Sequence, residues 1–241
     1  MKSLLSILLI TSCFYTSVNA QNKMENNQKL DPKQQSIVRI SALTATGDIE
    51  KLKVQLNKGL DAGLTTNEIK EVLVQLYAYC GFPRSLNGIT TLMAISEERK
   101  AKGLSDTDGK AVTPINDPDK YQTGKKTLQT LTGREEKALT GANAFAPAID
   151  TFLKEHLFAD IFSRDVLNHQ QRELVTISAL AAMTGVASQL QAHIGMGMNT
   201  GITESQLTDA FRIIDQTAGK TQGDLARATL EKLLAAKNNK N

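Results

Sequence analysis

Two related stretches decide the fold: QQSIVRISALTATGDIEKLKVQLNKGLDAGLTTNEIKEVL at residues 34–73 and QQRELVTISALAAMTGVASQLQAHIGMGMNTGITESQLTDAF at residues 170–211. Both run from a Gln-Gln pair through an identical Ile-Ser-Ala-Leu to a Gly, an aliphatic residue and a Thr. Gly63 matches Gly201 after a single insertion. Self-similarity over such a length predicts two copies of one structural unit.

Each copy carries the start and stop signals of three successive helices. The first segment has apolar residues at helical spacing, at Ile37, Ile40 and Leu43 in one copy and Ile177 and Leu180 in the other. A second helix is predicted at roughly residues 49–62 and 186–199, ending before a glycine suited to a left-handed cap. A third begins with a capping box at Thr65 and Thr203, each followed three residues later by Glu or Gln. Helices with such short connections predict an all-α bundle.

The remaining chain divides around these copies. We assign residues 21–101 to the first repeat and residues 131–241 to the second. Residues 102–130 are rich in Gly, Asp, Lys, Thr and Pro and are predicted to form an exposed linker. Two more helices, at about residues 134–144 and 145–157, are expected to lead into the second copy.

The N-terminal stretch MKSLLSILLITSCFYTSVNA, residues 1–20, is typical of a secretory signal peptide. It has one Lys, a short apolar run and a small-residue ending before Gln21. The run is too short to span a bilayer as a helix. Cleavage after Ala20 predicts an exported, periplasmic protein, and a lipoprotein site at Cys13 is the alternative.

Composition excludes some functions. The formal net charge is only +3 over 241 residues, and the basic side chains are scattered, which excludes nucleic acid as an expected partner. Aromatic residues make up 5% of the chain and Trp is absent, which favours helices over an all-β sandwich. After signal cleavage Cys80 is the remaining cysteine, so no internal disulfide and no Cys-x-x-Cys pair are expected.

The order of motifs resembles the carboxymuconolactone decarboxylase family, which includes the alkyl hydroperoxidase D-like proteins. The second copy carries FAPAIDTFLKEHLFADIFSRDVLNHQQRELVTISALAAM, then QLQAH, then GMNTGIT. The first copy adds EIKEVLVQLYAYCGFPRSLNG, with a Tyr-x-Gly-x-Pro ending at Tyr79 to Pro83. The matches cover nearly all of the mature chain except the linker. The resemblance implies two alkyl hydroperoxidase D-like helical bundle repeats in tandem, assembled as a trimer or a compact dimer.

The resemblance also implies a candidate catalytic set of His193, Glu173 and Arg172. The family's decarboxylase removes carbon dioxide from a carboxylated lactone and leaves an enolate-like carbanion that must be protonated. Histidine suits that step because its ordinary pKa is about 6.5. An Arg or Glu nearby would hold the substrate carboxylate or orient the imidazole. His193 and Glu173 lie on consecutive antiparallel helices, so we expect them to touch. The predicted partner is a small-molecule substrate, with no cofactor and no metal.

Two other interpretations stay open. The peroxidase branch of the family needs a Cys pair before its histidine, but Val186 and Gln189 occupy those places, and Gln55 stands opposite His193 in the first copy. Cys80 by itself could serve a one-cysteine peroxidase, or could simply pack. The chain could also be a non-catalytic oligomeric binding protein, with His193 a hydrogen-bonded core residue.

The methionine- and glycine-rich stretch IGMGM, residues 194–198, raises a separate question. Two glycines inside one helix each reduce its stability, by about 1 kcal/mol relative to alanine. They indicate either close packing of the helix against a neighbour or room for a ligand beside His193. The sequence does not choose between these.

Overall fold

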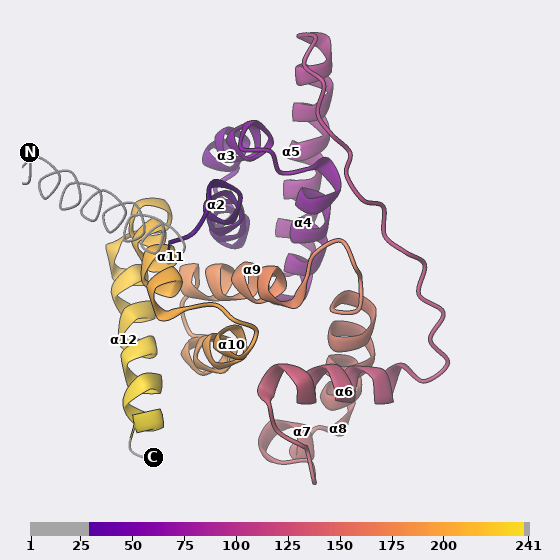
Figure 1. Ribbon diagram of the computed structural model, residues 1–241, viewed down its shortest axis with the longest axis vertical. Helices are drawn as coiled ribbons and strands as arrows, with labels where there is room; N and C mark the ends of the chain where they lie inside the picture. Colours follow the sequence, from indigo (N-terminus) through magenta and orange to yellow (C-terminus); the bar gives the residue numbers. More distant parts are fainter. Residues whose placement is uncertain (1–28, 239–241) are drawn as a thin grey trace, which may run out of the picture.

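The computed structural model describes residues 29–238, which contain helices and no β-strand (Figure 1). The predicted signal peptide and Cys13 lie outside this range. The helices are α2 (Pro32–Thr46), α3 (Ile49–Asp61), α4 (Thr66–Cys80), α5 (Phe82–Ala101), α6 (Lys120–Thr132), α7 (Gly141–Phe145), α8 (Pro147–Thr151), the π-helix η1 (Phe152–Ile161), α9 (His169–Ala182), α10 (Ala187–Asn199), α11 (Glu204–Thr217) and α12 (Lys220–Asn238). None of them is both long and apolar enough to cross a membrane.

The predicted all-α repeat is confirmed. Helices α2 to α5 form the first repeat, and α9 to α12 follow the same order in the second. The third helix of each begins with a complete capping box, at Thr65 and at Thr203. The preceding glycines have positive φ, 89° at Gly63 and 99° at Gly201, a conformation that glycine adopts without steric cost.

The helices of the two repeats pack into one shared core. Helices α2 and α9 pack against each other at the centre of the molecule, α4 packs on α9, and α11 packs on α2 (Figure 1). The core is continuous across both repeats and includes Val38, Ile40, Val175 and Ile177, each fully buried. Residues of the first repeat therefore reach the first helix of the second.

The linker predicted for residues 102–130 is shorter than its composition indicates. The chain has no helix between Ala101 and Lys120, but residues 120–130 belong to helix α6. Asp119 caps this helix by accepting a hydrogen bond from the amide of Gln122 at 3.1 Å. Leu131 near its end is fully buried. Tertiary packing thus makes a helix of a segment whose polar composition resembles a loop.

The helices expected at residues 134–144 and 145–157 also differ from those found. Residues 134–140 are not helical, since Gly133 ends α6 in the left-handed region with φ 66°. Two single-turn helices, α7 and α8, and the π-helix η1 follow. A β-carbon on Gly124 would lie 1.8 Å from the carbonyl oxygen of Lys154, so the glycine lets α6 cross η1 in close contact.

A buried ion cluster ties these elements together. The side chain of Lys154 is fully buried, and its Nζ lies 2.6 Å from Glu136 and 2.8 Å from Asp150. It also donates to the hydroxyl of Tyr121 at 3.1 Å. Burial opposes the charge on Lys154, but these partners outweigh burial and raise the pKa of the amine. The cluster holds α6, α8 and η1 as one unit beside α10 (Figure 1).

Candidate active site

His193 of α10 and Glu173 of α9 form a hydrogen-bonded pair in the second repeat. The imidazole Nδ1 lies 2.8 Å from the carboxylate Oε2. Glu173 is fully buried and His193 is 7% exposed. Because a carboxylate only accepts hydrogen bonds, Nδ1 donates, and the second ring nitrogen, Nε2, makes no hydrogen bond within residues 29–238. The predicted contact between the two residues is present.

Gly197 explains why α10 comes close enough to α9 for this bond. A β-carbon at Gly197 would lie 2.7 Å from Cδ1 of Ile177 and 3.7 Å from Cβ of Glu173. A β-carbon there would require the buried Ile177 side chain to shift, so this glycine serves close packing. Gly195 differs, since nothing lies within 4 Å of its would-be β-carbon. Close packing therefore accounts for Gly197 but not for Gly195.

Tyr79, at the end of α4, brings the first repeat into the site. Its ring meets the imidazole of His193 edge-on, with centroids 5.4 Å apart. Its hydroxyl is buried. Burial, and then the negative charge of Glu173, raise the pKa of this phenol far above its ordinary value, so it stays protonated. The sequence contained Tyr79 in its Tyr-x-Gly-x-Pro ending, but only the packing of α4 on α9 brings it to His193.

Arg172 points away from His193, toward the first repeat. Its terminal nitrogens donate to Gln75 at 3.0 Å and to Glu71 at 3.1 Å. Glu71 also receives a two-pronged ion pair from Arg164, with a shortest contact of 2.7 Å. Burial lowers the pKa of the fully buried Arg172 guanidinium, and Glu71 opposes that shift. In this arrangement Glu173 is the group that orients the imidazole, and Arg172 joins the two repeats.

Some buried polar atoms in and near this pair make no hydrogen bond. Within residues 29–238, four buried side-chain polar atoms have no partner: Ser41 Oγ, Tyr79 OH, Arg172 Nε and Glu173 Oε1. Three of them belong to residues already described here. An unsatisfied buried polar atom costs about 1–3 kcal/mol, so Glu173 Oε1 and Tyr79 OH, on the two residues that contact His193, are expensive for a region with only a structural role. They are one acceptor and one donor beside the imidazole.

The remaining candidate residues lie apart. Cys80 Sγ donates to the carbonyl of Leu76 at 3.1 Å, and burial raises the pKa of its thiol to about 11. His156 pairs with Asp160 at 3.1 Å on the π-helix. His169 begins α9, with its ring centroid 6.2 Å from that of Phe162. Within the described part of the chain, no three His, Cys, Asp or Glu side chains gather as a metal site would require.

Comparisons with known proteins give a match in each half of the chain. The model of the carboxymuconolactone decarboxylase family matches residues 14–91 and 147–231, more than half of the chain and one region in each repeat. The protein belongs to the carboxymuconolactone decarboxylase family. It is also similar to an uncharacterized protein of Methanocaldococcus jannaschii, 29% identical over 87 residues, which are 36% of this chain and 81% of that protein. This member of the family carries its histidine–glutamate pair in the second matched region.

Proposed function

We propose that this protein is an acid–base enzyme acting on a small carboxylated or lactone substrate, by decarboxylation or lactone-type proton transfer. The observation that carries the proposal is the bond between His193 Nδ1 and Glu173 Oε2, with unsatisfied polar atoms beside it. A buried carboxylate bonded to Nδ1 fixes the orientation and the tautomer of the imidazole. The free Nε2 then gives a proton to, or takes one from, the substrate carbon.

The neighbouring groups have supporting roles in this proposal. Loss of carbon dioxide leaves an electron pair delocalised onto the carbonyl oxygen of the product, which becomes an enolate. His193 protonates the carbon, and the neutral Tyr79 hydroxyl donates a hydrogen bond to the charged oxygen. Arg172 holds α4 against α9 through Glu71 and Gln75 and so keeps Tyr79 beside the imidazole.

The test replaces His193 with Gln, the residue that the first repeat has at Gln55. Turnover of a panel of carboxylated lactones, followed as released carbon dioxide, should fall by roughly 100-fold or more, as expected for removal of a general acid. His156→Gln is the matched control, since His156 is half exposed and lies on the π-helix. Unchanged turnover in His193→Gln, or a wild type inactive on every member of the panel, contradicts the proposal.

A thiol-dependent hydroperoxidase through Cys80 is the second candidate function. Its thiol is half-buried with a raised pKa, so little of it is thiolate at neutral pH, which favours the acid–base proposal. Alkylation of Cys80 separates the two. Lost hydroperoxide consumption would favour the thiol function, and no effect would remove it.

We also propose that the chain forms a homo-oligomer through α5. Its outer face exposes Phe82, Leu86 and Met93 with Ile89 between them, at the alternating spacing of four and three residues that pairs helices along a seam. A second copy presenting the same stripe would cover it. Leu86→Glu should then lower the mass measured by light scattering, whereas the exposed Lys100→Glu should not.

Export through the N-terminal signal is likewise a proposal. It is tested by N-terminal sequencing of the protein recovered from the periplasm, where a chain beginning at Gln21 is expected. Retention of the full leader contradicts it, and a lipid-modified Cys13 favours the anchored form instead.

A further inference from the structure

A groove lies on the outer face of α10, on the side away from Glu173. One wall is α10, with Gln191, Gly195 and Asn199, and the opposite wall is the last part of α12, with Leu233 and Lys237. The end of α6 and the turn after it, with Arg134, close the third side (Figure 1). The groove encloses about 700 Å³, within the usual size range of small-molecule sites. His193 is not among its lining residues, so the groove is separate from the candidate active site.

Gly195 forms part of the α10 wall, and neither its backbone conformation nor its packing against the described residues requires a glycine. It lies in the interior of α10 and does not have positive φ, so its backbone conformation suits any residue. Nothing lies within 4 Å of a β-carbon built on it, so packing does not exclude a side chain either. Alanine there would favour the helix. Because Gly195 has no side chain, the groove is deeper at this position.

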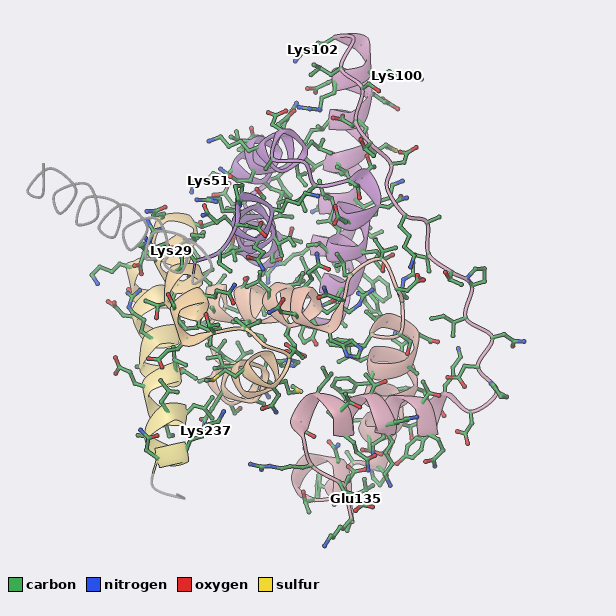
Figure 2. The ribbon with its side chains drawn as sticks, in the orientation of Figure 1. Lys29, Lys51, Lys100, Lys102, Glu135 and Lys237 are labelled. Atoms are coloured by element: carbon green, nitrogen blue, oxygen red, sulfur yellow. The ribbon has the colours of Figure 1, made fainter. Side chains whose placement is uncertain are left out.

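The charge at the rim is of one sign. Arg134 and Lys237 line the groove, and no Asp or Glu does. Among residues 29–238, neither cation has a carboxylate within 4.0 Å. Lys237, near the end of α12 in Figure 2, donates a hydrogen bond to the sulfur of Met198 at 3.9 Å. Polar side chains of α10 and apolar ones of α12 line the space between the two cations.

We propose that this groove is a second binding site, which takes a small amphipathic anion: a carboxylate or sulfonate with an apolar body. The acid group would lie between Arg134 and Lys237. The apolar body would lie over Gly195 against Leu233 and Ala236. The site is independent of the proposed acid–base chemistry, because α10 stands between the two.

The probe is 8-anilinonaphthalene-1-sulfonate, whose fluorescence rises in an apolar site, with octanoate as competitor. The full chain should bind one molecule of probe in a saturable manner, and octanoate should displace it. Gly195→Leu fills the groove and should weaken binding at least tenfold. Gly195→Ala adds a single carbon and should weaken it less than threefold.

The charge is tested by replacing Arg134 and Lys237 together with Gln. Binding should weaken three- to tenfold and lose most of its salt dependence, as expected when two rim cations are removed. Lys51 and Lys100, which lie on the opposite half of the molecule in Figure 2, provide the matched double control. His193→Gln should leave probe binding unchanged even where it removes turnover.

Two results would overturn the proposal. Equal probe affinity in wild type and Gly195→Leu would place the probe elsewhere. Sedimentation velocity on the same samples tests whether a second copy of the chain occupies the groove instead of a ligand. If Gly195→Leu splits an oligomer into smaller species, the groove is a subunit contact and not a ligand site.

Discussion

The helix contact beside Gly197 in the second repeat and the one beside Gly59 in the first are built from matching residues. An added β-carbon would meet Ile177, Ile202 and Glu173 in the second repeat and Ile40, Leu64 and Ser36 in the first. Ser36 therefore stands where Glu173 stands, and its hydroxyl donates to the carbonyl of Pro32 in its own helix. The first repeat makes the same helix pair without a buried carboxylate or an imidazole.

This difference teaches that the His193–Glu173 pair is not needed to hold two such helices together. The ion pairs made by the third helices of the two repeats also differ. Glu71 lies 3.1 Å from the fully buried Arg172 of the second repeat. Its counterpart Asp209 pairs with Arg212, one turn later in the same helix and 61% exposed. The more deeply buried ion pair thus lies on one side of a nearly symmetric core, where Arg172 joins the two repeats.

The largest expected effect comes from giving the second repeat the residues of the first. The double variant Glu173→Ser, His193→Gln should fold, because the first repeat packs with that pair. Its turnover of carboxylated lactones should fall by roughly 100- to 10,000-fold, the usual contribution of a general acid or base. Far-ultraviolet circular dichroism checks the fold. Replacing the matching residues of the first repeat, Ser36→Ala and Gln55→Ala, should leave turnover intact. A loss of turnover in these variants would contradict the assignment of one site per chain.

The next effect tests the unequal contacts between repeats. Glu71→Leu leaves the buried Arg172 without its carboxylate and should lower the free energy of unfolding by about 3–5 kcal/mol, measured with urea. Asp209→Asn removes a charge whose partner is mostly exposed, and about 1 kcal/mol or less is expected. Similar losses in the two variants would mean that the two contacts are energetically equivalent.

Alanine replacements of glycine should differ in sign within α10 and in size between α10 and α3. Gly197→Ala places a β-carbon 2.7 Å from Ile177 and should lower the free energy of unfolding by about 1–3 kcal/mol. Gly59→Ala should cost less, since its nearest contact would be 3.1 Å away. Gly195→Ala should raise stability by about 1 kcal/mol, as helix propensity predicts. Thermal and urea unfolding of the three variants give this ranking, and a stabilising Gly197→Ala would be inconsistent with close packing.

The smallest effect is a pH dependence of stability that comes from Glu71. Burial opposes ionisation of Glu71, but Arg164 and Arg172 outweigh burial and lower its pKa below the ordinary 4.5. A lowered folded-state pKa contributes stability above the ordinary pKa, and that stability is lost as the pH falls through the folded value. Urea unfolding between neutral pH and about pH 3 should show a loss below about 4.5 that is shallower in Glu71→Gln. If the loss of stability with falling pH were the same in Glu71→Gln as in the wild type, Glu71 would not be its source.

Local signals made the repeat and its helices predictable. The capping boxes at Thr65 and Thr203 satisfy the free amides of helices that begin one residue later, so their effect is confined to one turn. The contact between His193 and Glu173 was predictable for a similar reason, because the two residues lie on consecutive antiparallel helices. The roles of His193, Glu173 and Arg172 in catalysis stay predictions.

Other features depend on contacts that no local pattern records. Helix α6 has the composition of a linker and forms because Gly124 allows it to cross η1 and because Leu131 is buried. Gly195 and Gly197 are two residues apart in one helix, and only the neighbouring helices distinguish the open position from the packed one.

The sequence by itself determined the class of fold, the duplication and the one copy that holds a histidine, because these follow from residue spacing within short stretches of chain. Only the tertiary structure decided that Tyr79 of the first repeat meets His193 of the second, and that Arg172 turns to Glu71. The physical reason is that the helices of both repeats pack into one shared core. Each third helix packs against the first helices of both repeats, and that packing brings together side chains far apart in the chain.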